Sequence, residues 1–433
     1  MSTQNGLALY DQFYEQLTHQ RLADGECRDV RVGIGTILRR ERLKQGLKLI
    51  NVCRDLCSVS YYSRIERNEV MPDQDLLQAL FERLKIPFQA SIIVNHTEQQ
   101  DTLDQFFQHL AYGRNEELNQ FLKEKKGDVP LFHIMTLIHA LADGNLNKGE
   151  ECLKRVYIYR DLLTNLELAG LLYGTAQYYF KMDHYRQAKN YIDLAFKIEC
   201  QLPILKGYLH YLYAKVLSRL NQSLLAIEHI EKAQTIFSSL YINCFVLRSQ
   251  LFMAIEWSKR YPYKAKKQLN SLLQSSDIKS YPRYEHICRL HLALIEMRLQ
   301  NYHDSFKQLA YLLQKVDDDP LVEMVYAYLL IEAGRKDKVK HHLKEMKKMP
   351  LQSQRLKHMM LYLQSLANDD SPKKRIDLLE KTLIPTAIQA QDEVLEWEWR
   401  IRAIKLYEDQ ASYQEATRHY RELIKKVCPL TTI

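Results

Sequence analysis

The sequence predicts an all-α protein, and three observations support this fold class. Only 13 glycines and 11 prolines occur in 433 residues, so few residues favour β-hairpins and tight turns. Amphipathic segments of about 15–20 residues follow one another from about residue 100 onward, with no alternation of strand and helix patterns. Hydrophobic residues make up 46% of the chain, enough for the large core of a repeat array.

The chain divides into three parts by composition. Residues 1–30 are polar with a few aromatic side chains and are predicted to form an N-terminal arm. Residues 31–92 form a compact basic block, and residues 93–433 carry the repeated helices. A polar stretch at about 93–101 is the predicted linker between the last two parts.

Several classes of protein are disfavoured by what the sequence lacks. It has no apolar run long enough to span a membrane and no signal-peptide pattern, so we expect a cytoplasmic protein. Cys53 and Cys57 lie one helical turn apart, but two ligands alone do not form a tetrahedral zinc site. Phosphate-binding glycine loops, zinc-protease motifs and nucleophile elbows do not occur. We therefore expect neither metal nor cofactor, and no enzymatic activity.

The basic block, residues 33–90, is predicted to fold into five short helices. Four of them are placed at Ile34–Gln45, Lys48–Leu56, Tyr61–Arg67 and Gln74–Leu84. Gly46 suits the end of the first helix, Cys57–Val59 the turn before the third, and Ser60 its N-terminal cap. Two short helices separated by such a turn match the helix-turn-helix motif, whose second helix enters the DNA major groove.

Charge in this block agrees with DNA binding. Residues 31–90 contain eleven basic and seven acidic residues, against a net charge of +8 for the whole chain. Half of the net charge thus falls in about a seventh of the length. Neutralising DNA phosphates requires such a concentration of cationic side chains.

The block resembles the phage-repressor or Xre family of helix-turn-helix domains. The resemblance rests on Gly35-x-x-Leu38-x-x-x-Arg42-x-x-x-Gly46-Leu47, followed by Ser63-Arg64-Ile65-Glu66-Arg67-Asn68 and Pro72. It implies an internal ion pair between Arg42 and Glu66, which we assign to structure. Two departures from the family are Lys48-Leu49 in place of Ser-Gln and a turn one residue shorter. The shorter turn is similar to that of peptide-pheromone regulators.

Base and phosphate contacts are expected from the third helix and from the start of the second. Arginine binds guanine with two hydrogen bonds, and tyrosine and serine hydroxyls bond bases or phosphates. The predicted DNA-binding residues are Lys48, Ser60, Tyr61, Tyr62, Arg64 and Arg67. A solvated surface role is the alternative for each.

From about residue 100 onward, small residues recur in a regular pattern. Each hairpin contributes one residue from each of its two helices, in the pairs Ala176 and Ala188, Ala214 and Ala226, Ala254 and Ala265, Ala293 and Ser305, and, more weakly, Ala327 and Val339, and Ala403 and Ala416. The first members of the first five pairs are 38, 40, 39 and 34 residues apart. This spacing is typical of tetratricopeptide repeats, which stack into a right-handed superhelix with a groove. Earlier pairs at 103–123 and 134–156 begin the array. A plain helical bundle is the alternative that the regular spacing disfavours.

Together the two parts resemble the Rap/Rgg/NprR/PlcR/PrgX type of peptide-pheromone-responsive regulator, and the length is nearest to NprR-like members. The resemblance implies a homodimeric quorum-sensing transcription regulator whose partners are operator DNA and a short signalling peptide. An alternative is a Rap-like adaptor that sequesters a signalling protein such as a response regulator. Loss of regulation on substituting Tyr61 and Arg64 would favour the regulator, and retained regulation the adaptor.

Peptide contacts are expected from repeat positions that face the groove. Amides and hydroxyls bond an extended backbone, and Lys215 or Arg248 suits a terminal carboxylate. Counting from the small residues selects Tyr173, Gln177, Tyr208, Tyr211, Lys215, Arg248, Tyr328 and Arg400. Packing between repeats is the alternative role for each of them.

Overall fold

The structure is a computed structural model that describes residues 34–67, 69–70, 72–86, 96–124, 129–157, 163–198, 202–315, 319–346 and 354–427. Every regular element in these residues is a helix, which confirms the all-α prediction. The chain falls into two compact units, Met1–Leu212 and Tyr213–Ile433. The division lies inside one helix, Pro203–Arg219 (α12).

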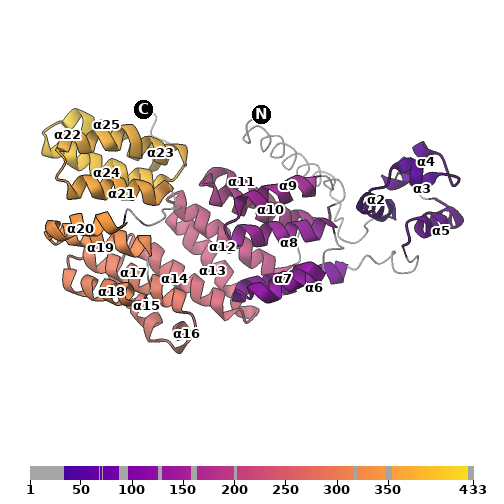
Figure 1. Ribbon diagram of the computed structural model, residues 1–433, viewed down its shortest axis with the longest axis horizontal. Helices are drawn as coiled ribbons and strands as arrows, with labels where there is room; N and C mark the ends of the chain where they lie inside the picture. The colour runs from indigo at the N-terminus through magenta and orange to yellow at the C-terminus, as the bar shows by residue number, and fades with distance from the viewer. Residues whose placement is uncertain are drawn as a thin grey trace. The chain divides into compact units, whose positions relative to one another are not determined.

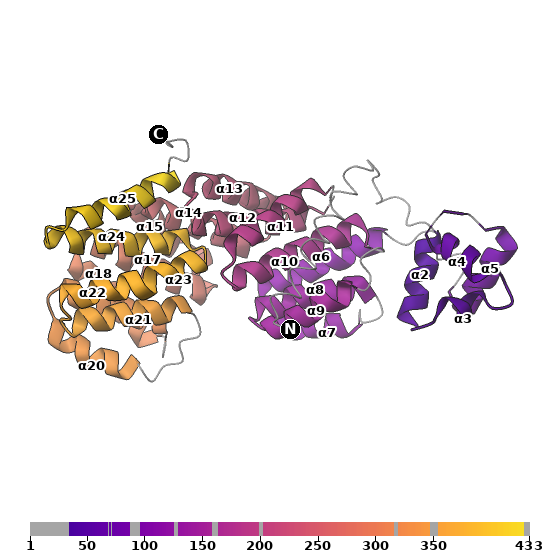
Figure 2. The same ribbon diagram turned by 90° about the horizontal axis from the view of Figure 1, so that it is seen from above.

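Four helices near the N-terminus gather around a core of their own (Figure 2). They are α2 (Ile34–Lys44), α3 (Leu49–Cys53), α4 (Val59–Glu66) and α5 (Gln74–Arg83). Leu38, Val52, Ile65 and Leu80 are among the side chains buried between them. The fifth helix expected within residues 33–90 is not found among the described residues of that range. Gly46 has a φ of 66° and ends α2 as predicted.

The turn between α3 and α4 differs from the prediction. The second helix ends at Cys53 instead of Leu56, because Asp55 takes a left-handed conformation with a φ of 63°. Helix α4 begins at Val59, and the Ser58 hydroxyl, not that of Ser60, accepts the hydrogen bond from the Tyr61 amide at 3.1 Å. The turn therefore spans five residues, 54–58, and the predicted short turn is wrong.

The remaining helices pair into antiparallel hairpins. In the first unit these are α6 (His96–Tyr112) with α7 (Asn115–Glu124), α8 (Val129–Ala142) with α9 (Leu146–Tyr157), and α10 (Asn165–Lys181) with α11 (Tyr185–Lys197). Helix α6 starts at His96, so helix occupies most of the predicted linker at 93–101, whose residues 93–95 lie outside the described part. The hairpins predicted at 103–123 and 134–156 are both present.

Hairpins of the second unit continue the same pattern (Figure 1). Helix α12 leads into α13 (Ser223–Ser239) and is followed by α14 (Asn243–Ser258) with α15 (Pro262–Gln274), α16 (Ser276–Lys279), α17 (Pro282–Arg298) with α18 (Tyr302–Lys315), α19 (Pro320–Glu332) with α20 (Lys336–Met346), α21 (Gln354–Ala367) with α22 (Pro372–Leu378), the π-helix η2 (Leu379–Leu383) and α23 (Ile384–Gln389), and α24 (Glu393–Asp409) with α25 (Tyr413–Val427). Pro385 has no amide hydrogen to donate, which accounts for the widened turn that precedes it.

The small residues that predicted the repeat lie where helices cross. All twelve are buried, with Ala416 at 2% exposure and the others at 0%. A further crossing uses Gly174, where an added Cβ would approach the Leu137 side chain within 2.7 Å. Several hairpin turns also share a left-handed residue after the first helix, including Asp183, Asn221 and Gln300. The close helix crossings and the repeated turn conformation together determine how each hairpin packs against the next.

Candidate functional site

Helix α4 has two faces of different character. Tyr62, Ile65 and Glu66 are buried against the other helices of the domain. Successive residues are about 100° apart around an α-helix, so Ser60, Arg64 and Arg67 share the opposite face. All three side chains are exposed. This outward face combines a hydroxyl with two guanidinium groups.

A buried ion pair fixes the orientation of α4. Arg42 of α2 donates two hydrogen bonds to the Glu66 carboxylate, from Nε at 2.6 Å and from Nη2 at 2.8 Å. Its Nη1 also donates to the Leu47 carbonyl at 2.9 Å. The hydrogen bonding to Glu66 raises the pKa of Arg42. The two residues are only 8% and 5% exposed. The pair implied by the family resemblance is therefore present and has a structural role.

The predicted DNA-binding residues divide by exposure. Lys48, Ser60, Arg64 and Arg67 are exposed, and Tyr61 is half-buried. Tyr62 is completely buried in the core, and burial raises the pKa of its hydroxyl. We therefore take Tyr62 as a core residue. Contact with a base or phosphate would require it to leave the core.

Both arginines on the outward face share one acidic neighbour. Arg64 Nε lies 3.7 Å from Glu69, and Arg67 Nη1 lies 3.2 Å from the same carboxylate. All three side chains are about half exposed, so these pairs contribute little to stability and exchange readily for phosphates. Sequence reasoning did not select Ser63, which is half-buried beside them. Its spacing of three residues from Ser60 was the signal that could have found it.

In the first unit, two of the predicted peptide contacts belong to the core. Tyr173 and Tyr208 are 5% and 4% exposed, and both rings pack against Phe107. The Tyr208 hydroxyl donates to the Phe107 carbonyl at 3.0 Å. Gln177 and Tyr211 are half-buried. The side-chain oxygen of Gln177 is buried without a hydrogen-bond partner and so retains an unused acceptor.

In the second unit, Lys215, Arg248 and Tyr328 are half-buried. Arg248 lies over the Phe245 ring, with its guanidinium carbon 4.4 Å from the ring centroid, and donates to the Tyr284 hydroxyl. Arg400 is 8% exposed and is held by Glu396 at 2.8 Å. Its Nη1 also lies 3.2 Å from Nδ1 of His419 in α25, so the guanidinium joins α24 to α25.

A cluster around Arg402 was not found from the sequence. Its guanidinium carbon lies 5.3, 4.7 and 5.3 Å from the ring centroids of Tyr328, Tyr362 and Trp399. Arg402 also donates to Glu398 at 2.7 Å. Burial raises the pKa of Tyr328 to about 12, so its hydroxyl stays protonated. These rings come from three helices, α19, α21 and α24, and no spacing along the chain indicates that they meet.

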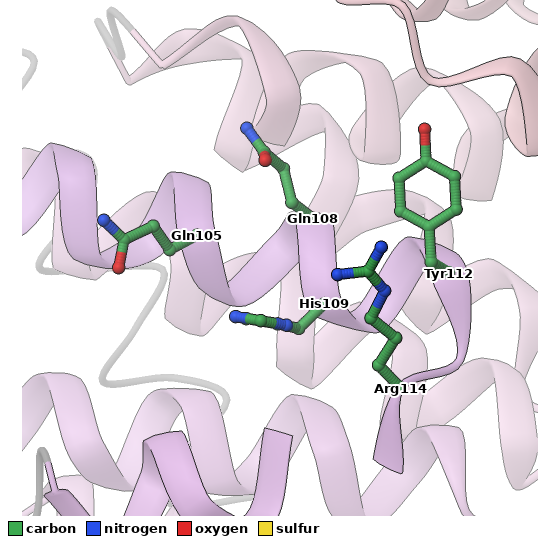
Figure 3. Close-up of a pocket in the computed structure, with 5 residues that line it drawn as sticks. All are labelled: Gln105, Gln108, His109, Tyr112 and Arg114. Atoms are coloured by element: carbon green, nitrogen blue, oxygen red, sulfur yellow. The ribbon is translucent and has the colours of Figure 1, made fainter. Parts of the chain in front are cut away.

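An open recess lies along α6 and the turn that follows it. Figure 3 shows its five lining side chains, which are Gln105, Gln108, His109, Tyr112 and Arg114. The recess holds about 350 Å³ of empty space, part of it open to solvent. Glu117 pairs with both His109 and Arg114 at 3.2 Å, which leaves the recess polar and close to neutral. Sequence reasoning did not select these residues.

Within the described residues, no group of three or more histidine, cysteine, aspartate or glutamate side chains is placed to hold a metal ion. Among the same residues, no helix combines the length and the apolar character needed to cross a membrane.

Comparison with known proteins found a family match within the basic block. Residues 38–90 match the family described as helix-turn-helix. No curated protein matches the chain by sequence. The basic block is thus a helix-turn-helix domain of the Xre type.

Solved structures similar to the chain share its helical-repeat fold. The apo form of the quorum sensor NprR from B. thuringiensis has a TM-score of 0.57 at 15% identity, covering 76% of this chain and 99% of its own. NprR in complex with its cognate peptide NprX has a TM-score of 0.60 at 16% identity, covering 75% and 98%. A Rap protein complexed with competence and sporulation factor has a TM-score of 0.62 at 14% identity, covering 77% and 98%. The chain therefore has the fold of NprR and Rap proteins.

Proposed function

We propose that the chain is a cytoplasmic transcription regulator that binds operator DNA through α4 and is switched by a short signalling peptide bound to its repeats. The observation that carries this proposal is the outward face of α4, where Ser60, Arg64 and Arg67 are exposed. The Arg42–Glu66 pair fixes that face outward. In helix-turn-helix domains the equivalent helix enters the major groove, where arginine reads guanine.

The proposed regulator acts as a homodimer. A single helix-turn-helix domain contacts too few base pairs to select one site in a genome. Two copies on adjacent half-sites double the contacted sequence. Lys48, which is exposed in an extended segment before α3, is the proposed phosphate contact that sets the register of each copy.

The proposed peptide contacts are Gln177 and Tyr211 in the first unit and Lys215, Arg248 and Tyr328 in the second. The buried, unpartnered side-chain oxygen of Gln177 supports this role, since it can accept a hydrogen bond from a peptide amide. A cationic side chain, Lys215 or Arg248, takes the terminal carboxylate. The buried Tyr173 and Tyr208 pack against Phe107, and the buried Arg400 is held by Glu396, so we assign these three residues a supporting role. Two of the similar structures, of NprR and of a Rap protein, are complexes with NprX and with competence and sporulation factor.

The direct experiment first selects an operator from a randomised duplex pool and then compares variants by electrophoretic mobility shift. We expect Arg64→Ala to weaken binding by about 10- to 100-fold and to relax sequence preference, because a bidentate base contact is lost. Arg67→Ala is expected to weaken binding of all sequences and to reduce the salt dependence.

The matched control is the double variant Lys338→Ala/Lys340→Ala, which removes two exposed charges from α20. It should bind the selected operator like the wild type. If no operator is selected, or if the α20 control loses as much affinity as Arg64→Ala, the proposed mode of DNA binding is wrong.

A second candidate function is a protein-interaction adaptor that captures a signalling protein such as a response regulator. The polar recess along α6 favours it, because its glutamine amides and Arg114 offer hydrogen bonds away from the helix-turn-helix domain. The two functions separate in cells that carry Tyr61→Ala/Arg64→Ala. Regulation that survives this change supports the adaptor, and regulation that is lost supports the DNA-binding regulator.

A further inference from the structure

Cationic side chains are concentrated around the turn that joins α14 to α15 (Figure 1). Residues 257–276 contain no acidic residue and five cationic ones, which are Lys259, Arg260, Lys264, Lys266 and Lys267. Residues 31–90 account for +4 of the net charge of +8, so +4 remains for the rest of the chain. The five cations of this one stretch exceed that remainder, and such a concentration favours a polyanionic partner.

Two of the five cations are neutralised by buried carboxylates. Lys259 lies 2.7 Å from Glu256, and Lys266 lies 2.7 Å from Glu296. The two glutamates are only 2% and 4% exposed. These lysines therefore compensate charges within the repeats, and we leave them out of the surface that is available to a partner.

The other three cations of this stretch are exposed, and within the described residues they have no acidic partner. Lys264 Nζ lies 3.5 Å from the centroid of the Trp257 ring, a contact that leaves its charge unbalanced. For the side chains of Arg260 and Lys267, the described part of the chain supplies no hydrogen bond or ion pair. The turn therefore offers three cations to an added anion.

Two tyrosine rings lie among these cations. Tyr261 is 60% exposed and Tyr263 is 73% exposed. In the hairpins of α11 and α18, a tyrosine three positions before the small residue packs inward, as Tyr185 at 3% exposure and as the half-buried Tyr302. In α15 this position is Pro262, the first residue of the helix. The tyrosines on either side of the proline are therefore left on the surface.

We define Arg260, Tyr261, Tyr263, Lys264 and Lys267 as the basic turn. Cations alone match any polyanion, so the rings decide which polyanion fits. An exposed tyrosine ring stacks on the face of an unpaired base, and cations beside it bind the phosphates of the same strand. A duplex hides its base faces in the helical stack, and lipid headgroups and carboxylates have no such face. The combination favours a single strand of nucleic acid.

We propose that the basic turn binds single-stranded RNA, with bases stacked on Tyr261 and Tyr263 and with phosphates against Arg260, Lys264 and Lys267. DNA in a cell is paired except transiently, whereas the loops and ends of RNA expose their bases. Stacking is tolerant of sequence because every base has a flat face. The basic turn therefore binds unpaired RNA with little preference for sequence.

Fluorescence anisotropy of the full chain with a labelled single-stranded oligouridine tests the inference. Every protein compared carries Arg64→Ala/Arg67→Ala, which removes the outward cations of α4. We expect Tyr261→Ala/Tyr263→Ala to raise the dissociation constant by about 30-fold or more, because two bases lose their stacking platform. Tyr261→Phe/Tyr263→Phe keeps both rings and should stay within about threefold of the parent. Pairing the strand with oligoadenosine should weaken binding by about tenfold or more.

The matched control is Tyr413→Ala in α25, which removes a tyrosine that is 65% exposed at the start of another second helix. It should bind oligouridine like the parent. Arg260→Gln/Lys267→Gln should reduce the slope of log affinity against log salt by about 1.4, since each phosphate contact on a single strand contributes about 0.7. Circular dichroism and melting temperature verify that each variant is folded.

Ultraviolet crosslinking in cells identifies the source of the strand. We expect an adduct that RNase removes and that is missing in Tyr261→Ala/Tyr263→Ala. An adduct that only DNase removes, an oligouridine affinity that the alanine pair leaves unchanged, or a loss that Tyr413→Ala reproduces would overturn the inference. Binding to phosphatidylglycerol vesicles that depends on the two tyrosines, in place of RNA binding, would assign the basic turn to a membrane and would also overturn it.

The inference goes beyond the proposed function, and the two are tested separately. Tyr261→Ala/Tyr263→Ala should bind the selected operator like the wild type, because α4 is unchanged. Arg64→Ala/Arg67→Ala should retain the oligouridine binding that depends on the two tyrosines. Failure to select an operator thus contradicts the proposed function alone, and loss of this oligouridine binding contradicts the RNA site alone.

Discussion

At the scale of single residues, the Arg42–Glu66 pair sets the orientation of α4, the second helix of the helix-turn-helix. Both side chains are buried, and together they make two short charge-assisted hydrogen bonds. Removing one partner leaves an uncompensated charge in the core. The cost of such a change, about 3–5 kcal/mol, greatly exceeds the net stability that the intact pair contributes.

Arg42→Ala is therefore expected to destabilise the helix-turn-helix domain by about 3–5 kcal/mol. Arg42→Met/Glu66→Leu, which removes both charges, should recover most of that loss. Hydrogen exchange at the amides of α4 measures the effect, because opening of the domain exposes them. Full protection of α4 in Arg42→Ala would contradict the assignment of this pair to structure.

Tyrosines 61 and 62 mark the limit of prediction at the residue scale. They are adjacent and identical in type, yet Tyr61 is half-buried and Tyr62 is completely buried. Which of them faces outward depends on the phase of α4, and the sequence does not determine that phase. The ion pair was predictable because the family motif that contains Arg42 and Glu66 fixes their relation. The orientation of a side chain within a helix has no such motif.

At the scale of elements, Glu380 joins the last hairpin to the π-helix before it. It accepts hydrogen bonds from His419 at 2.7 Å, Tyr407 at 3.0 Å and Arg418 at 2.7 Å. The bond from His419, with those from Tyr407 and Arg418, lowers the pKa of Glu380 to about 2. The ionised carboxylate therefore links η2, α24 and α25.

The pKa of Glu380 is lower in the folded protein than its usual value of about 4.3. Ionised Glu380 therefore stabilises the fold at pH values above about 4.3. The contribution is lost as the pH falls toward 2. We expect Glu380→Gln to lower the melting temperature at pH 5 and to flatten its decline between pH 5 and pH 2. Differential scanning calorimetry across this range provides the check. The hypothesis is rejected if wild type and variant show the same dependence on pH.

Sequence reasoning placed the elements well and their ends less well. Residues at helix crossings must be small, so six hairpins from Ala176 to Ala416 were found from the sequence, whereas the hairpin of α21 with α22, η2 and α23 carries no predicted pair and was missed. The turn before α4 was misplaced because Asp55 takes a left-handed conformation, which non-glycine residues seldom adopt. The predicted cap of this helix was Ser60, whereas in the structure the Ser58 side chain caps it.

At the scale of the whole molecule, the order of a helix-turn-helix domain and a helical array followed from sequence motifs and repeat spacing. Contacts between distant hairpins did not follow from the sequence. Arg355 and Arg219 approach the buried Asp392 at 3.0 and 3.7 Å, although Arg219 lies 173 residues earlier in the chain. Such a contact depends on how each hairpin is rotated relative to the next. The small residues that reveal the repeat do not encode that rotation.

The central claim is that α4 reads DNA in the cell. Chromatin immunoprecipitation of the tagged protein, compared with a Tyr61→Ala/Arg64→Ala variant, tests it most directly. We predict a few sharp sites for the wild type, including one beside its own gene, and loss of these sites in the variant. A wild-type profile that never rises above that of the variant would contradict the claim and would direct the search to protein partners of the repeats.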